Sequence, residues 1–255
     1  MKKKLAIAAG CILLVPIAAI AALFAMREPP DGPRVEAAPG VVGVEAGGAY
    51  AWVVRTPKGA VLIDAGLDAS GTAILAELKR LGVEPGQVHA VLVTHGHPDH
   101  YAAASVFPSA AIAVGSADLP MLRGDTTHYS PFGRIMATVM PLPSAPQTVS
   151  TLRGGEEMAF DGARFQVIAT PGHSPGSVVF LYDTILFTGD SLMRKKDGLT
   201  TAPSLFSEDA ARNRDSLRAL APLPFTIVAD GHAGVARDAK AKLMRLLGGS
   251  ALPGR

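Results

Sequence analysis

A stretch of seven residues decides the fold: Thr94-His95-Gly96-His97-Pro98-Asp99-His100. It places three of the chain's seven histidines, with one carboxylate, within six residues. An almost wholly apolar run over 90–94 leads into it and predicts a strand covered on both faces. A strand that ends in a tight loop can direct several side chains into one space, and imidazole nitrogens and carboxylate oxygens are ligands that zinc accepts. The spacing therefore predicts a metal site. The alternative, a group of surface histidines that cap a helix, is disfavoured because this pattern rarely arises by chance.

Three further candidate ligands follow other apolar strands. The turn over 170–176 offers His173, the turn over 186–190 offers Asp190, and the turn over 228–232 offers His232. Each turn contains a glycine, which lets the backbone bend sharply beside the candidate ligand. Taken singly, a histidine or aspartate at a strand end is typical of caps and turns. Together, and in this order, the three turns strengthen the prediction of a metal site.

These motifs resemble those of the metallo-β-lactamase superfamily over nearly all of 41–248. The resemblance implies an α/β (α+β) fold, a four-layer αββα sandwich with its metals at one rim of the two sheets. It implies three ligands for a first metal, three for a second and one bridging carboxylate: His95, His97 and His173; Asp99, His100 and His232; and Asp190.

Asp64, in Ile63-Asp64-Ala65-Gly66, matches the family's aspartate that holds the ligand loop from behind. A partner of that kind fixes the tautomer and the orientation of a ligand histidine. The alternative is a turn aspartate that binds only backbone groups, which is a common use of aspartate.

Two metals about 3.5–4 Å apart can share a hydroxide and ready it as a nucleophile near neutral pH. Two zinc ions, Asp99, Asp190 and a hydroxide sum to a formal charge of about +1, which suits a substrate that develops an oxyanion. Asp99 is the candidate catalytic residue, expected to orient the nucleophile and to accept its proton. Two zinc ions per chain are the expected cofactors, and iron or manganese fits the same ligand types.

The full ligand set contains Asp190 and no cysteine, since the one cysteine of the chain is Cys11. In this it resembles the glyoxalase II and lactonase-like branch, which implies hydrolysis of a carboxylic ester, lactone or thioester. A metal-dependent phosphodiesterase or β-lactam hydrolase is the enzymatic alternative. A metal-binding interaction domain without turnover is the alternative outside the enzymes. The cluster Arg194, Lys195 and Lys196 could bind a substrate carboxylate, or it could be a solvated basic turn.

The N-terminal run Leu5–Met26 carries no charge and follows three lysines. As a helix, its 22 residues would span roughly 33 Å, about one hydrocarbon core. An uncleaved transmembrane anchor is therefore expected, with the lysines in the cytoplasm. A cleaved signal peptide is the main alternative, because 19–21 resembles a cleavage site, and lipidation at Cys11 is another. All three imply an exported protein that faces the periplasm or another extracytoplasmic side, anchored to the inner membrane or released.

The expected domains are an anchor or signal peptide over 1–28, a linker over 29–40, the hydrolase over 41–248 and a tail over 249–255. Within the hydrolase, strands are expected over 51–56, 60–64, 90–94, 111–114, 164–169, 178–182, 185–188 and 226–229, and helices over 73–81, 208–220 and 236–247. The segment 118–150 fits no regular pattern, and it is either a lid or an ordinary surface excursion.

The composition narrows the class of partner. Apolar residues make up 48% of the chain and charged residues 18%, which argues against disorder over most of it. The net charge is +2, and the sequence has no basic stripe with interleaved aromatic residues. We therefore expect a small-molecule substrate and a membrane as partners, and no nucleic acid.

Overall fold

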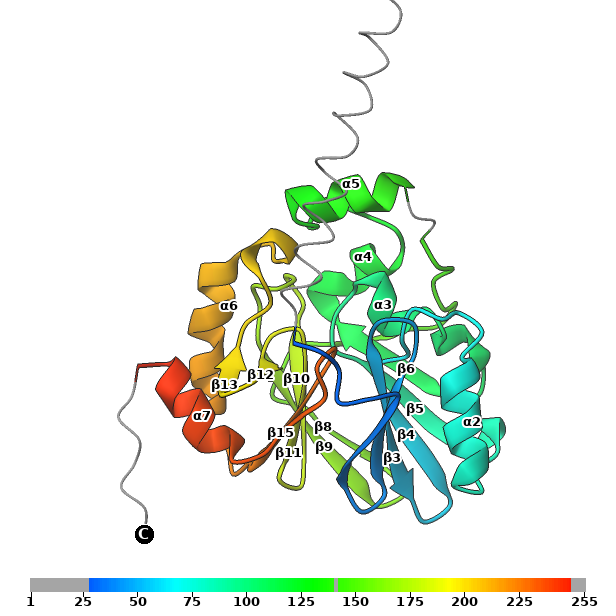
Figure 1. Ribbon diagram of the computed structural model, residues 1–255. Helices are drawn as coiled ribbons and strands as arrows, with labels where there is room; N and C mark the ends of the chain where they lie inside the picture. Colours follow the sequence, from blue (N-terminus) through cyan, green and yellow to red (C-terminus); the bar gives the residue numbers. More distant parts are fainter. Residues whose placement is uncertain (1–27, 140–141, 249–255) are drawn as a thin grey trace, which may run out of the picture.

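The computed structural model describes residues 28–139 and 142–248, which form two mixed β-sheets packed face to face (Figure 1). The first sheet has seven strands in chain order: β1 (Arg34–Ala38), β2 (Val41–Glu45), β3 (Tyr50–Thr56), β4 (Gly59–Ile63), β5 (Val88–Val93), β6 (Ala111–Gly115) and β7 (Ser150–Leu152). The second has six, in spatial order: β15 (Val235–Ala236), β14 (Ile227–Asp230), β11 (Ile185–Gly189), β10 (Val178–Tyr182), β9 (Ala163–Ala169) and β8 (Glu157–Phe160). A hairpin of β12 (Met193–Lys195) and β13 (Gly198–Thr200) stands apart from both sheets.

Side chains alternate along the central strands and so divide the core into three layers. In β3, Trp52 and Val54 pack toward the second sheet, whereas Ala51 and Val53 pack on the opposite face. In β10, Phe180 packs between the sheets, and its neighbours pack toward the outer helices of the second sheet. Both faces of these strands are covered over most of their length, and most of their residues are therefore apolar.

Helices cover the two outer faces (Figure 1). On the first sheet, α2 (Thr72–Arg80) buries Ile74 and Leu78 in the outer core layer. On the second, α6 (Ala210–Ser216) leads into a 3-10 turn, and α7 (Ala239–Leu246) buries Leu243. The α/β sandwich that the family resemblance implies is thus confirmed.

Strand direction brings the candidate ligands to one rim. Strands β4 and β5 are parallel neighbours in the first sheet, and β11 and β14 are parallel neighbours in the second. The carboxyl ends of parallel strands lie at the same edge of a sheet. The turns that follow these four strands therefore meet at one end of the sandwich.

The expected linker over 29–40 differs from the structure. Residues Arg34–Ala38 form β1 and pair with β2, and the Asp31 carboxylate accepts a hydrogen bond from the backbone N–H of Val235. The folded domain therefore begins before residue 41. The glycines and prolines of this segment suggested a linker. It forms the edge strand β1 because its backbone pairs with β2, and such pairing is not visible in the local sequence.

Other expectations concern the chain ends. Residues 1–27 of the expected anchor, and the expected tail over 249–255, lie outside the described residues. Within the described ranges, no helix combines the length and the apolar character that a membrane crossing needs.

The segment 118–150 is more regular than its sequence suggests. It contains two helices, α4 (Leu119–Leu122) and α5 (Pro131–Val139), before β7 begins. None of the residues of α5 is buried, and the helix lies above the rim of the sheets rather than on the core (Figure 1).

A core prediction follows from the layer between the sheets. Phe187 is fully buried, and its ring centroid lies 6.0 Å from that of Trp52, the only tryptophan. We expect Phe187→Ala to lower the free energy of unfolding by about 3–5 kcal/mol because it leaves a cavity. Urea unfolding of the metal-free protein, followed by Trp52 fluorescence, measures this. The control Ile135→Ala, at a side chain 62% exposed, should change it by less than about 0.5 kcal/mol. An equal effect of both substitutions would contradict the assignment of Phe187 to the core layer between the two sheets.

Candidate metal centre

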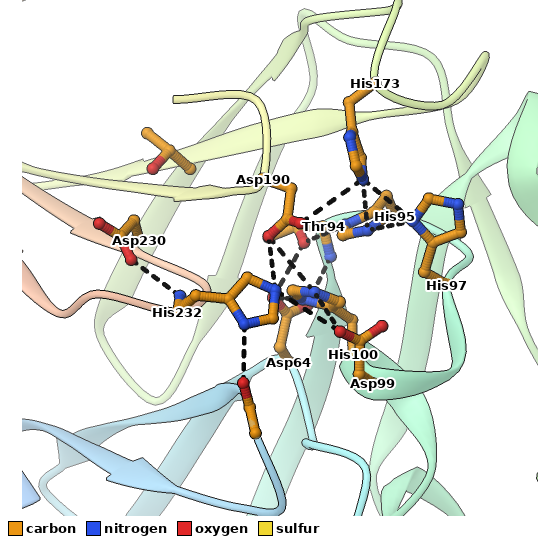
Figure 2. A network of polar contacts seen from close by, with 12 residues as sticks. Asp64, Thr94, His95, His97, Asp99, His100, His173, Asp190, Asp230 and His232 are labelled. Carbon is orange, nitrogen blue, oxygen red and sulfur yellow. Dashed lines mark hydrogen bonds and ion pairs between the residues drawn. The ribbon is translucent and has the colours of Figure 1, made fainter. Parts of the chain in front are cut away.

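The structure brings all seven predicted ligand residues to the common rim of the two sheets (Figure 2). The short helix α3 (Pro98–Tyr101) and the turn before it supply four of them, directly after β5. The other three follow β9, β11 and β14. The seven are His95, His97, Asp99, His100, His173, Asp190 and His232.

Three imidazole nitrogens form one corner of the site. Nε2 of His95 lies 3.0 Å from Nδ1 of His97 and 3.1 Å from Nε2 of His173, and the last two atoms are 3.0 Å apart. Each neutral nitrogen carries a single proton or a single lone pair in its ring plane, so three that converge cannot all bond one another. Around a tetrahedral zinc ion, ligand nitrogens lie about 3.3 Å apart. The triangle therefore has the shape and the chemistry of a metal site.

A second set of atoms lies beside the triangle. Nε2 of His232 is 3.5 Å from Oδ2 of Asp99, and Nε2 of His100 is 3.7 Å from the same oxygen. Imidazole nitrogen and carboxylate oxygen are again the ligand types that zinc accepts. This set could hold a second ion.

The carboxylate of Asp190 lies between the two sets. Its Oδ2 is 3.7 Å from Nε2 of His173, and its Oδ1 is 3.2 Å from Nε2 of His232 and 3.5 Å from Nε2 of His100. Oδ1 of Asp190 and both of these Nε2 atoms are buried without a hydrogen-bond partner. Buried polar atoms rarely lack partners, and an ion at this point would satisfy all three. The described residues thus fit two metal ions.

Hydrogen bonds at Nδ1 orient three of the ligand rings, those of His95, His173 and His232. The hydroxyl of Thr94 donates to Asp64 and so can accept from Nδ1–H of His95. Nδ1 of His173 contacts the hydroxyl of Ser207, and Nδ1–H of His232 donates to the carbonyl of Gly48. Each bond at Nδ1 leaves the lone pair of Nε2 directed into the site.

Asp64 lies where the sequence suggested, behind the loop that carries the candidate ligands. Its carboxylate accepts hydrogen bonds from the backbone N–H of Thr94 at 2.7 Å and from Nδ1 of His100 at 2.8 Å. The residue is 1% exposed and adopts a φ of 59°, in the left-handed region that few side chains enter. The contact with His100 excludes the alternative of an aspartate that binds only backbone groups.

Asp118 is a positioning residue that the sequence did not reveal. It is fully buried, and its carboxylate accepts from the backbone N–H groups of Gly96 and Gly176 and from the hydroxyl of Ser174. It therefore joins the loop of His95 and His97 to the loop of His173. No local pattern marked it, because it lies at the start of the segment that seemed irregular.

Asp230 was also missed as a positioning residue. Its carboxylate accepts from the backbone N–H groups of His232, Ala233 and Gly234, and so shapes the turn that carries His232. Next to it, Gly231 leaves room for the ligands, since a Cβ there would lie 2.7 Å from Oδ1 of Asp190. The run Asp230-Gly231-His232 was visible in the sequence, but only its histidine was assigned.

Burial and charge set the protonation of the ligands. Burial lowers the pKa of His173 to about 3, and burial also lowers the pKa values of His95 and His97. Burial opposes the charged form of His100 as well, but the carboxylates of Asp64, Asp99 and Asp190 outweigh it and raise its pKa to about 10. Asp190, in the same way, raises the pKa of His232. The first set is therefore neutral near pH 7, and the second holds bound protons when no metal is present.

A cavity of about 260 Å³ opens above the ligands. Its floor includes His97, Asp99, His173, Asp190 and His232, and its walls are largely apolar side chains, with several from α5. Concave, mostly apolar pockets with a few convergent polar groups are typical of small-molecule sites.

The basic cluster does not take part in this cavity. Arg194 lies 3.1 Å from the Asp31 carboxylate and donates to the carbonyl groups of Ala233 and Pro29. Lys195 and Lys196 are exposed, and the described residues that line the cavity include none of the three. The substrate-binding interpretation of this cluster is therefore not supported, because the guanidinium holds the N-terminal segment against the turn after β14.

Comparison with known proteins places the chain in a family. Residues 44–232 match the family model described as the Metallo-beta-lactamase superfamily. The hydroxyacylglutathione hydrolase of Xanthomonas axonopodis pv. citri (strain 306) is 31% identical over 188 residues, 72% of this chain and 60% of that protein. The probable metallo-hydrolase YflN of Bacillus subtilis (strain 168) is 27% identical and covers 79% of this chain and 87% of its own length. The chain thus spans about 60% of the hydroxyacylglutathione hydrolase that it matches.

Solved structures agree on the fold. A metallo-beta-lactamase family protein from Thermus thermophilus superposes with a TM-score of 0.65 at 22% identity, covering 83% of this chain and 79% of that one. The B3 metallo-beta-lactamase BLEG-1 gives a TM-score of 0.61 at 27% identity, covering 77% and 91%. With the family match over most of the folded domain and the ligand set at its rim, the chain belongs to the metallo-β-lactamase superfamily of metal-dependent hydrolases.

Proposed function

We propose that this protein is a dinuclear zinc hydrolase that acts on a carboxylic ester, lactone or thioester. One observation carries the proposal: Asp190 turns one carboxylate oxygen to each of two ligand sets, and Oδ1 is buried without a hydrogen-bond partner. His95, His97 and His173 would hold one ion, and Asp99, His100 and His232 the other. Iron or manganese could occupy the same atoms.

The bound ions would supply a Lewis acid for the scissile carbonyl and water activated near neutral pH. The chain's own residues provide the rest. Asp99 lines the cavity, and its pKa is lowered because His100 and His232 outweigh the opposing effect of burial. Its carboxylate is therefore ionised at neutral pH and can orient a water molecule and take up its proton. Asp64 and Asp118 hold the ligand loops in place.

The comparisons support an acyl substrate. The relative from Xanthomonas axonopodis is by name a hydrolase of hydroxyacylglutathione, which is a thioester. The lactamases among the solved structures share the fold at 18–27% identity, which carries no substrate assignment. We therefore keep ester, lactone and thioester hydrolysis as the proposed chemistry.

Removing the bridging charge tests the dinuclear centre. We expect Asp190→Asn to lower bound zinc from about two ions per chain to one or fewer, and kcat/KM by more than about 100-fold, since even the partners of ligands contribute 10–100-fold. Elemental analysis and an ester, lactone and thioester panel measure both. Asp215→Asn, at a side chain 75% exposed, is the matched control. Unchanged zinc content and turnover in Asp190→Asn would contradict the proposal.

Proton release tests the two sets separately. Zinc binds neutral imidazole, so an ion in the first set should displace few protons at pH 7, because His173 has a pKa of about 3. An ion in the second set should displace more protons, because the pKa of His100 is about 10 and the pKa of His232 is also raised. As the pH falls, the affinity of the second set should fall first. Zinc titration calorimetry in buffers of different ionisation enthalpy measures this, and equal release at both steps would argue against the assignment.

We also propose that the domain is exported, on the basis of the uncharged run Leu5–Met26 behind three lysines. The full chain, expressed in a bacterium, should then fractionate with the inner membrane and be open to protease added to spheroplasts. Removal of residues 1–27 should leave it in the cytosol. Cytosolic recovery of the full chain would contradict export, and a shortened N-terminus in the periplasm would favour the cleaved signal peptide.

A further inference from the structure

The walls of the cavity differ in kind from its floor. Every charged residue among the described lining residues belongs to the metal ligand set, and none of the lining residues is lysine or arginine. The walls are formed mainly by apolar side chains: Leu67, Pro98, Phe132, Met136, Ala137, Leu142 and Phe206. A charged substituent would lose its hydration against such walls without gaining a lysine or arginine as a partner, which is costly.

Several of these apolar side chains are not used by the core. Leu67, Phe132, Met136 and Leu142 belong to none of the three core clusters formed by the described residues. All four line the cavity instead. Their apolar surface is therefore available to a ligand rather than committed to folding.

Helix α5 presents one face to the cavity. Phe132, Gly133, Met136 and Ala137 are half-buried and line it, at the i, i+1, i+4 and i+5 spacing of one helix face. Ile135 and Val139 are 62% and 71% exposed and do not line it. The ring of Phe132 meets that of Phe206 edge to face at 5.3 Å, which fixes this side of the helix over the cavity.

We propose that the substrate is an uncharged ester or lactone with an apolar acyl group of medium length, which binds against Phe132 and Met136 of α5. This deepens the proposed function and rests on it. Ions held by the ligand residues would polarise the carbonyl, and the apolar walls would bind the acyl chain. The cavity of about 260 Å³ is near the lower end of the usual range for small-molecule sites, about 300–1,000 Å³, so the gain from a longer acyl chain ends once the cavity is full.

A homologous series tests the proposal. Ethyl esters from acetate to decanoate, and the glutathione thioester of each acyl group, are given to the zinc-loaded protein, with acid release followed in a pH-stat. We expect kcat/KM for the ethyl esters to rise about fourfold for each added methylene and then level off. We divide each kcat/KM by the rate constant for uncatalysed hydrolysis of the same compound by hydroxide. For each acyl group, this ratio should be higher for the ethyl ester than for the charged glutathione thioester.

Neighbouring residues of α5 supply the variants. Phe132→Ser and Met136→Ser should flatten the dependence on chain length, lowering kcat/KM for octanoate more than for acetate. Ile135→Ser, adjacent to Met136 but on the outer face, should leave the dependence unchanged. Far-UV circular dichroism and zinc content verify that each variant is folded and loaded.

The two proposals fail in different ways. No zinc-dependent turnover of any ester or thioester would overturn the proposed function. Turnover that is independent of acyl length, or that favours the glutathione thioester, would overturn only the apolar substrate. An equal loss of chain-length dependence in Ile135→Ser and Met136→Ser would also overturn it, because the effect would not come from the cavity face.

Discussion

At the ends of β4 and β5, the buried Asp64 carboxylate accepts hydrogen bonds from the backbone and hydroxyl of Thr94 and from Nδ1 of His100, and the geometry of the candidate metal centre depends on these contacts. Through Thr94 they also set the tautomer of His95. One carboxylate thus orients one ligand of each set. The cost of burying its charge and of its left-handed backbone is offset by donors that surround it.

Asp118 plays the corresponding part on the opposite side of the centre. It joins the turn before α3 to the turn after β9, which belong to different sheets. Apolar packing between the sheets is not directional, and hydrogen bonds supplement it, such as those from the indole N–H of Trp52 to the carbonyl of Asp230 and from the backbone N–H of Val178 to the carbonyl of Thr94. Directional bonds from two buried aspartates therefore place ligands from both sheets within the few tenths of an ångström that metal coordination requires.

The walls of the site are less rigidly built than its floor. The ligands stand on strand ends and short turns with buried hydrogen bonds, whereas α5 has no buried residue and packs the ring of Phe132 on that of Phe206. A rigid floor with a lightly attached wall separates two tasks: the floor fixes the reacting group, and the wall selects the substituent. Changes in α5 can therefore alter specificity at little cost to the fold.

The sequence by itself determined the ligand types, their grouping and the central strands. A metal ligand is defined by its own side chain, and a buried strand by its local apolar run, so both are visible in short stretches. It missed Asp118, it suggested a linker over 29–40, and it left open whether Arg194 contacts the substrate. Only the tertiary structure decided these, because each depends on a contact with another part of the chain. Asp118 accepts a hydrogen bond from Ser174, β1 pairs with β2, and Arg194 forms an ion pair with Asp31. The apolar cavity was likewise invisible, since an apolar side chain in the sequence looks the same whether it faces the core or a ligand.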